Sequence, residues 1–250
     1  MADPGRVTRV LQALSTDIPD DRALAERICL ACTDGLDIDG AAISLMTASA
    51  MRETLFASDP TASLLDELQF TLGEGPCIEA ATSGRPVLVP DVDDVVETSR
   101  WPVYSNAVVE RTDVRAIFAL PLQWGTINLG VLDMYRRAPG SLSRVQLGDA
   151  MSVADTAALM LLDLRTDPDQ DRRDENRPGA GARAENKPRD RSWGNRTEVH
   201  QATGMIVAQL GISASDAFAR LRAHAFTEQR LLTHVARDVV GRHLHFTKET

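Results

Sequence analysis

The sequence predicts an α+β domain with a mixed or antiparallel sheet, followed by a small all-α domain of three helices. Residues 5–164 alternate helical patterns with short apolar runs that are typical of strands. Residues 165–195 are rich in charge, proline and glycine, which favours a flexible linker. Residues 196–246 then place apolar side chains at helical spacing between clear helix ends. A chain of 250 residues is long enough for both domains.

The first domain is expected to run helix, two strands, helices, three strands and a closing helix. Trp124-Gly125-Thr126 is a hairpin connection between the last two strands, so part of the sheet must be antiparallel. Ser143 and Gln146 have the spacing of a capping box that begins the closing helix. The expected ranges are 21–33, 63–70 and 143–164 for the helices and 40–47, 53–57, 86–90, 115–122 and 127–135 for the strands.

Charge is distributed unevenly along the chain. Residues 1–164 carry 12 Arg and 24 acidic residues, whereas residues 165–196 sum to +2 and residues 197–250 to +1, with all five histidines in the last segment. An acidic first domain repels polyanions, so a nucleic-acid contact is expected only toward the C-terminus. The alternative interpretation is that the acidic surface only keeps the large domain soluble.

Two absences exclude several kinds of chemistry from the first domain. No lysine precedes Lys187, so neither a P-loop nor a phosphoacceptor receiver domain fits there. No histidine precedes His200, which excludes an axial haem ligand, a histidine-based metal site and a Ser–His–Asp arrangement. We therefore expect no metal and no cofactor; the His243-x-His245 pair alone is a poor metal site.

The three cysteines, Cys29, Cys32 and Cys77, fit a reducing compartment without a disulfide framework. Cys29 and Cys32 lie in a helical pattern, where buried structural cysteine is the main interpretation and a thiol switch is the alternative. Cys77 follows a Gly-Pro turn, so we expect partial exposure. The N-terminus has no apolar signal segment, and no apolar run reaches the ~18 to 20 residues that span a bilayer, so we expect a cytoplasmic protein without membrane contact.

The C-terminal segment has the pattern of three short helices. Gly211 ends the first helix, Ser213 and Asp216 approximate a capping box for the second, and Thr227 is the expected N-cap of the third. The apolar sides consist of Val199, Ala202, Ile206 and Leu210, then Phe218, Leu221 and Ala225, then Leu232, Val235, Ala236 and Val239.

The polar side of the third helix carries a row of basic groups. Arg230, His234 and Arg237 fall at positions i, i+4 and i+7, roughly opposite the apolar stripe, and could meet RNA phosphates. Arg222 flanks this row from the second helix, and the linker residues Arg189, Arg191 and Arg196 lie nearby in the sequence. An ordinary solvated helix face is the alternative.

This segment resembles the ANTAR domain, a three-helix module that binds RNA hairpins and prevents transcription termination. The matching residues are Gln201-Ala202, Gly204-Met205, Gly211-Ile212-Ser213, Ala217-Phe218, Leu221-Arg222 and Val235-Ala236. Thr203 stands where the family often has a lysine, so one basic contact common in relatives is missing. The resemblance and the polar face together give the expected RNA-binding residues: Arg222, Arg230, His234, Arg237, Thr203 and Gly204.

The first domain resembles the GAF domain, a small-molecule sensor fold. The resemblance is carried by Leu72-Gly-Glu-Gly-Pro-Cys-Ile-Glu-Ala80, by Leu129-Gly130-Val131-Leu132 and by the turn Arg137-Ala-Pro139-Gly140. It implies either a ligand pocket among the central strands and covering helices or a domain that only dimerises. The candidate ligand contacts, chosen by residue type alone, are Cys77, Trp101, Tyr104 and Phe118, and plain core is the main interpretation of each.

These expectations combine into a cytoplasmic, homodimeric regulator that responds to a signal and binds RNA hairpins in nascent transcripts. It is expected to act in transcription antitermination and to catalyse nothing. One alternative is a DNA-binding regulator that uses the three helices as a helix-turn-helix. The other is a thiol enzyme, because some GAF-fold proteins reduce methionine sulfoxide with cysteines.

Overall fold

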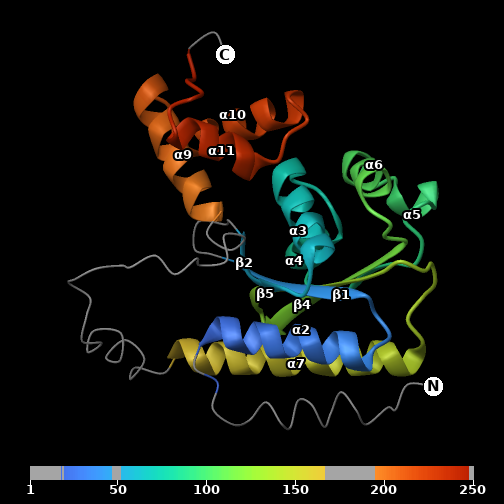
Figure 1. Ribbon diagram of the computed structural model, residues 1–250. Coiled ribbons are helices and arrows are strands. Elements are labelled where there is room, and N and C mark those ends of the chain that lie inside the picture. Colours follow the sequence, from blue (N-terminus) through green and yellow to red (C-terminus); the bar gives the residue numbers. More distant parts are fainter. Residues whose placement is uncertain (1–17, 19, 47–51, 167–194, 248–250) are drawn as a thin grey trace.

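The computed structural model describes residues 18, 20–46, 52–166 and 195–247, which form two units in contact (Figure 1). Residues 47–51 and most of the predicted linker, including Arg189 and Arg191, lie outside the described residues. The first unit is a five-stranded sheet between two layers of helices, and the second is a bundle of three helices. The expected α+β domain followed by an all-α domain is therefore confirmed.

The sheet has the strand order β2-β1-β5-β4-β3, and each neighbouring pair is antiparallel. Strand β3 lies at the edge of the sheet and is flanked by Pro86 and Pro90. This is the position that the sequence predicts, because proline has no N–H group to donate to a neighbouring strand. The strands are β1 (Gly40–Met46), β2 (Arg52–Ala57), β3 (Val87–Val89), β4 (Ala116–Trp124) and β5 (Ile127–Arg136).

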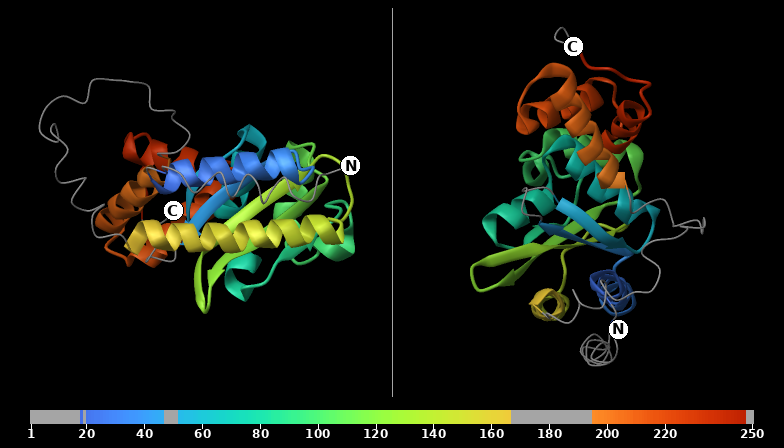
Figure 2. Two further views of the ribbon diagram at one scale, coloured as in Figure 1. Left: turned by 90° about the horizontal axis from the view of Figure 1, so that it is seen from below. Right: turned by 90° about the vertical axis from the view of Figure 1, so that its left-hand side faces the viewer.

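Helices cover both faces of the sheet. The helices of the first unit are α2 (Asp21–Gly35), α3 (Pro60–Leu72), α4 (Pro76–Ser83), α5 (Val95–Thr98), α6 (Pro102–Arg111) and α7 (Arg144–Thr166). Helices α2 and α7 run side by side under one face (Figure 2), where Leu24, Leu132 and Val153 belong to one core. Helices α3, α4 and α6 lie on the other face, where Leu65 and Val108 belong to a second core.

Helix α7 is long and apolar enough, by length and composition alone, to cross a membrane. The segment also carries the charged residues Asp149, Asp155 and Asp163. In the structure, Val153 and Ala157 of α7 pack into the core beneath the sheet together with residues of α2. One side of α7 therefore packs on the sheet, while Val145, Met151 and Leu159 on its outer side are exposed.

The helices begin where short polar side chains precede apolar patterns. Asp59 caps α3 by accepting hydrogen bonds from the backbone N–H groups of Thr61 and Ala62, and Pro60 occupies the first turn. The capping box predicted for α7 is present: the Ser143 N–H donates to Gln146 Oε1 (2.9 Å) and the Gln146 N–H donates to Ser143 Oγ (3.2 Å). These caps fix where α3 and α7 start relative to the sheet.

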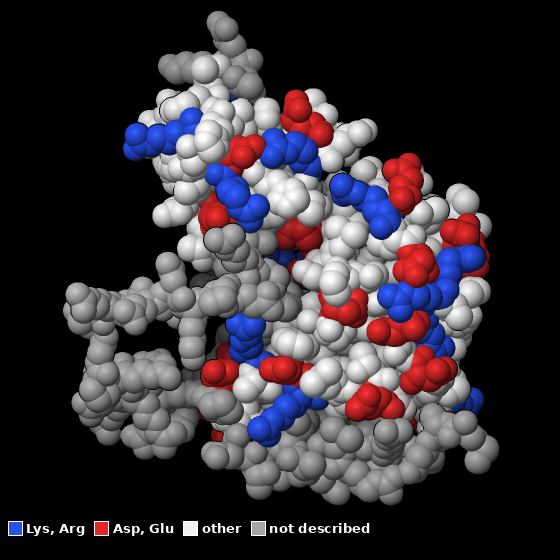
Figure 3. Space-filling model, in the orientation of Figure 1, with Lys and Arg blue, Asp and Glu red and all other residues white. Residues whose placement is uncertain are grey.

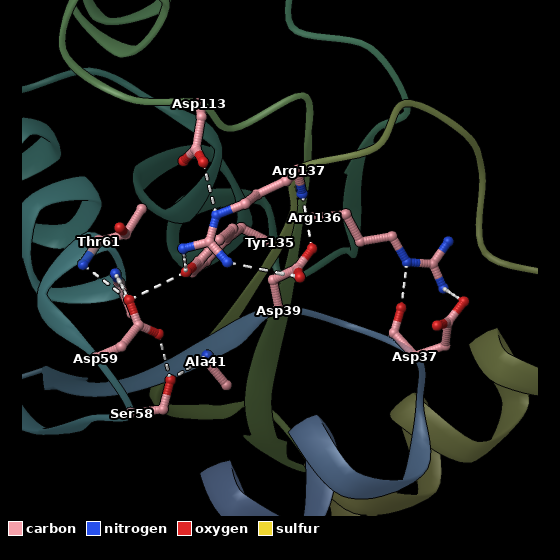
Figure 4. A network of polar contacts seen from close by, with 11 residues as sticks. Asp37, Asp39, Ala41, Ser58, Asp59, Thr61, Asp113, Tyr135, Arg136 and Arg137 are labelled. Carbon is pink, nitrogen blue, oxygen red and sulfur yellow. Dashed lines mark hydrogen bonds and ion pairs between the residues drawn. The ribbon is translucent and has the colours of Figure 1, made fainter.

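A polar network ties the start of α3 to the ends of β5 and β1 (Figure 4). The Tyr135 hydroxyl donates to Asp59 Oδ1 (3.0 Å), and Arg137 forms ion pairs with Asp39 and Asp113 at 3.6 and 2.8 Å. A side chain at Gly40 would meet Asp59 Oδ2 at 2.1 Å, so only glycine leaves room for this network. The position of α3 over the sheet is therefore strongly constrained.

The second unit consists of α9 (Asn195–Leu210), α10 (Ala214–Thr227) and α11 (Leu232–Val240). Gly211 has φ 67 after α9, and Ser213 Oγ accepts from the Asp216 N–H (3.1 Å), so both predicted helix ends are confirmed. The predicted N-cap at Thr227 is wrong, because Thr227 is the last residue of α10 and Leu231 precedes α11. The chain turns instead through Gln229, which has φ 53.

Gly130 is the position at which the central strand pair tolerates no side chain. A Cβ there would lie 2.1 Å from the Ser44 carbonyl oxygen and 2.9 Å from Leu45 Cα, both backbone atoms of β1. We predict that Gly130→Ala lowers the free energy of unfolding by roughly 1–3 kcal/mol through overpacking. Urea unfolding followed by circular dichroism measures this.

Gly148 supplies the matched control, because it lies exposed in α7 and an added Cβ would meet nothing within 4 Å. Gly148→Ala should leave stability unchanged or raise it by about 1 kcal/mol, since alanine favours a helix. Equal unfolding midpoints for the two variants would contradict the close approach of β1 and β5.

Candidate functional site

A cluster of polar side chains is buried between the sheet and the helices α3, α4 and α6. Its members come from five different elements, and each is less than a tenth exposed: Arg52 of β2, Asp66 of α3, Cys77 of α4, Tyr104 of α6 and Asp133 of β5. Burying charged and polar groups together is costly unless they are paired. A cluster of this kind in a small domain therefore marks a candidate functional site.

Asp66 is the best-paired member of the cluster. Its carboxylate lies 3.5 Å from the Arg52 guanidinium, forms an ion pair with Arg196 of α9 and accepts a hydrogen bond from the Thr54 hydroxyl. Burial alone would raise the pKa of Asp66, but the two guanidinium groups and the Thr54 hydroxyl outweigh it and hold the pKa below its usual value. Asp66 is therefore ionised at neutral pH.

Asp133 has the opposite environment. Burial raises the pKa of Asp133 to about 7, and the nearby Arg52 offsets this only in part. Neither of its carboxylate oxygens has a hydrogen-bond partner of normal geometry among the described residues, and the same holds for the Tyr104 hydroxyl. Two buried groups with unused hydrogen-bonding capacity thus face the same part of the core.

A small cavity adjoins these two groups. It has a volume of about 10 Å³, and Gln69, Tyr104, Asp133 and Tyr135 line its polar side. That is room for about one water molecule. Drug-sized ligands occupy clefts of ~300 to 1,000 Å³, so the cavity in this arrangement is closed to all but the smallest molecules.

Cys77 belongs to the same cluster and is fully buried, so the expected partial exposure is wrong. Pro76 begins helix α4 rather than a loop, which turns Cys77 into the core, where its side chain is fully buried. Its sulfur contacts the Arg52 guanidinium and lies 3.8 Å from Ser44 Oγ. Burial raises the pKa of the Cys77 thiol well above its usual value in spite of Arg52, so the thiol stays protonated.

The other two cysteines are also buried, within the core shared by α2 and α7. Burial raises the pKa of Cys29, with a smaller contribution from Cys32, and raises the pKa of Cys32 to about 12. Neither thiol has the exposed, electropositive surroundings that make a cysteine reactive. This is the environment of structural cysteines.

The four residues proposed from the sequence as ligand contacts do not share one site. Cys77 and Tyr104 belong to the buried cluster, and Trp101 lies in the same core with the Arg100 guanidinium 4.3 Å above its ring. Phe118 lies on the opposite face of the sheet, in the core beneath α2 and α7. Side chains alternate along β4, so Ile117 and Ala119 face the cluster and Phe118 cannot.

The three-helix unit packs directly on α3, and the contact reaches the buried cluster. The Arg196 guanidinium pairs with Asp66, donates to the Arg52 carbonyl oxygen and lies 4.3 Å from the centre of the Phe70 ring. Farther along α3, Thr71 Oγ1 accepts from the Leu232 N–H (3.0 Å). Arg196 was expected among the basic groups near the RNA, but it is buried instead.

The predicted RNA-binding residues are spread over several environments. Arg230 pairs with Asp238 (2.7 Å), Arg237 pairs with Glu198 (3.3 Å), and His234 lies exposed beside both arginines. Burial and these two arginines lower the pKa of His234, so the imidazole is neutral at pH 7. On the face that Figure 3 shows, acidic and basic side chains of this unit are mixed.

The remaining three predicted residues lie elsewhere. Arg222 turns toward the first unit, where it donates to the Phe70 carbonyl oxygen (3.3 Å) and stacks 4.6 Å from the Phe218 ring. The Thr203 hydroxyl donates to the Val199 carbonyl within α9 (2.7 Å), and Gly204 is exposed with open space around it. The structure therefore brings Arg230, His234 and Arg237 together and separates them from the other three.

Family models match both units, and the similar solved structures match the first unit alone. The GAF domain model matches residues 20–161, and the ANTAR domain model matches residues 193–240. The GAF domain of a phosphoenolpyruvate-protein phosphotransferase from Coxiella burnetii is 12% identical with a TM-score of 0.52, covering 66% of this chain and 97% of that one. The corresponding GAF domain from Acinetobacter is 10% identical with a TM-score of 0.51, covering 64% and 92%.

A free methionine-R-sulfoxide reductase from Neisseria meningitidis is similar as well, at 14% identity and a TM-score of 0.49, covering 64% of this chain and 88% of that one. Likenesses at these identities show the fold alone and carry no argument about activity. A comparison with curated proteins finds no match.

The buried Asp133 predicts a distinctive pH dependence of stability. Because its pKa of about 7 lies above the ordinary aspartate pKa of 3.8, the folded protein holds an extra proton between these two pH values. This contribution to the free energy of unfolding is full below pH ~4 and falls as the pH rises toward 7, by at most about 1.4 kcal/mol per pH unit. Asp133→Asn removes it, so the variant should gain stability relative to wild type between pH 4 and 8.

Urea unfolding at several pH values measures the difference, with Asp34→Asn as an exposed control on α2. A stability difference between wild type and Asp133→Asn that does not change with pH would contradict the raised pKa.

Proposed function

Because this chain belongs to the GAF-domain family and ends in an ANTAR domain, we propose that it is a signal-responsive, RNA-binding regulator of transcription antitermination. The observation that carries the proposal is the ANTAR match over 193–240, together with a three-helix core over the same residues. An ANTAR domain acts by holding a hairpin of the nascent transcript. RNA held in that hairpin cannot form the competing terminator, so the effect is a shift of equilibrium without catalysis.

The proposed RNA contact is the surface of Arg230, His234 and Arg237. Arg230 precedes α11, the other two residues lie on it, and all three side chains are at least partly accessible. Arg230 and Arg237 form ion pairs with Asp238 and Glu198, and phosphates would compete with these two carboxylates for the guanidinium groups. A mixed surface of this kind favours recognition of hairpin shape and loop bases over strong nonspecific binding.

The proposed sensor is the GAF domain, and its buried cluster is the best candidate for the receiving site. Asp133 and Tyr104 offer unpaired hydrogen-bonding atoms beside a cavity of about 10 Å³. Asp133 accepts hydrogen bonds in either protonation state, which suits a small ligand that carries N–H or O–H donors. Anything larger than water would have to enlarge the cavity, so binding would move the helices that cover it.

We also propose that the protein works in the cytoplasm as a homodimer. Support for the dimer comes from the outer surface of α2 and α7, which leaves Leu30, Val145, Met151 and Leu159 exposed. Pairing this surface in two copies would bury these side chains and present two ANTAR domains to paired hairpins.

The dimer proposal predicts that Leu30→Glu with Leu159→Glu produces a monomer, because each substitution places a charge in an apolar contact. Sedimentation equilibrium measures the mass, and Val95→Glu, at an exposed valine of α5, serves as the control. A wild-type protein that sediments as a monomer at micromolar concentration would overturn this part of the proposal.

The two alternatives from the sequence find less support. A helix-turn-helix reads bases with the first residues of its recognition helix, whereas the start of α11 is buried against α3 through Leu232 and Thr233. A thiol enzyme requires an accessible thiolate, whereas the Cys77 thiol is buried with a raised pKa.

Mobility shifts with hairpin RNA and with duplex DNA test the proposal. We predict that Arg230→Gln with Arg237→Gln weakens hairpin binding about tenfold and reduces the slope of log affinity against log salt by roughly 2, since two phosphate contacts are lost. The control is Arg100→Gln, an exposed arginine of the GAF domain, which should bind as wild type does. Tighter binding to duplex DNA than to hairpins would favour the helix-turn-helix alternative.

A further inference from the structure

The outer face of α3 is covered by the ANTAR domain. Phe70 of α3 is 5% exposed and belongs to the same apolar cluster as the ANTAR core residues Val199, Leu221 and Val235. Its ring lies 6.0 Å from that of Phe218 on α10. An apolar residue of one domain thus completes the core of the other, which gives this contact the character of a specific interface.

Polar contacts surround this apolar centre and fix the orientation of the bundle. Glu67 accepts a hydrogen bond from the Thr233 hydroxyl (2.8 Å), and Thr71 accepts one from the Leu232 N–H (3.0 Å). Both acceptors lie on α3, and both donors lie in the first turn of α11. The start of α11 is thereby held against the GAF domain.

The strongest polar contact is the ion pair of Asp66 with Arg196. The two side chains are 4% and 10% exposed, so Asp66 would be left as a buried charge with one partner fewer if Arg196 moved away. Arg52 pairs with the same carboxylate and continues inward to the Cys77 sulfur. A continuous series of polar contacts therefore links Arg196 of the ANTAR domain to the cluster proposed as the receiving site.

This packing limits access to the proposed RNA contact. Arg230 borders a groove of about 600 Å³ whose opposite wall includes Glu110 and Arg111 of α6. His234 borders a crevice of about 200 Å³ whose GAF side includes Glu53 and Glu67. An RNA stem laid on the ANTAR surface would bring its phosphates up to these carboxylates, which repel them.

We propose that this arrangement is a closed state in which the GAF domain competes with RNA for the ANTAR domain, and that the Arg196–Asp66 ion pair is the latch. Opening separates α11 from α3, frees Arg222 from the Phe70 carbonyl oxygen, widens the groove beside Arg230 and removes the acidic side chains from the path of the RNA. The proposal rests on the proposed function, because it assumes that RNA binds the ANTAR surface.

The position of Arg52 explains how a signal could reach the latch. Arg52 touches Asp66 on one side and Cys77 on the other, and its main-chain carbonyl accepts from Arg196. A ligand that enlarges the cavity beside Asp133 must displace neighbours of Arg52. Any shift of Arg52 disturbs its ion pair with Asp66 and the hydrogen bond from Arg196 to its carbonyl oxygen. Ligand binding at the site and closure of the domains are therefore energetically coupled.

The test uses the full chain as wild type, Arg196→Gln and Asp66→Asn, with Arg115→Gln as a control at a surface ion pair of the GAF domain. Small-angle X-ray scattering reports compactness, and mobility shifts report affinity for hairpin RNA. We expect both latch variants to expand and to bind RNA about tenfold more tightly, because the competent state is then no longer a minor population. Asp66→Asn should gain at least as much as Arg196→Gln, since it retains the arginine.

Glu67→Ala provides a second route to the same opening, because it removes the Thr233 contact without changing the buried cluster, and it guards against misfolding of Asp66→Asn. Latch variants that stay as compact as wild type, or that expand without any gain in affinity, would overturn the closed-state proposal. If no protein, wild type included, binds hairpin RNA, the proposed function fails. If wild type binds hairpin RNA and the latch variants bind it no more tightly, the closed-state proposal alone fails.

Discussion

The arrangement of this protein depends on a carboxylate buried between two guanidinium groups. Asp66 is taken out of water by α3 and the sheet, and its charge is tolerable only because Arg52 and Arg196 flank it. One of these partners belongs to the GAF domain and the other to the ANTAR domain. The electrostatic requirement of a single side chain therefore links the core of the sensor to the position of the output domain.

The surrounding fold supplies the rigidity that this pairing needs. The Asp59 cap and the network of Tyr135 and Arg137 fix the start of α3 (Figure 4). Gly73, in the left-handed conformation, ends the helix. A helix held at both ends carries Asp66 and Gln69 toward the cluster and Phe70 toward the bundle. Helix α3 is thus the common wall of two cores, and a displacement of this helix would be felt in both.

Local periodicity and caps in the sequence predicted α2, α3, α7, the three C-terminal helices and the five strands, whereas α4, α5 and α6 were not placed. The families of the two domains came from the resemblance of short motifs. Within the site it was less informative. Phe118 could have been excluded from the pocket by the alternation of β4, and Asp133 could have been found as the one charge in the apolar run 127–135. The burial of Cys77 was missed because Gly75-Pro76 reads equally well as a turn or as the start of a helix.

Contacts between the domains could not be predicted in this way. Asp66 and Arg196 are 130 positions apart, and neither has a local pattern that points to the other. Arg196 stands at the end of a basic segment, so sequence reasoning assigned it to solvent and RNA. Only the docked geometry, in which Phe70 and Arg196 stack, gives this arginine a buried role.

The same separation has a consequence for how the chain is made. Domains generally fold in order as they emerge from the ribosome, so the sheet and α3 exist before residue 196 has been synthesised. During that interval Asp66 has only one cation, and the Phe70 ring faces water. Until α9, α10 and α11 pack on α3, the first domain therefore presents an apolar ring and a carboxylate that lacks one of its two cationic partners.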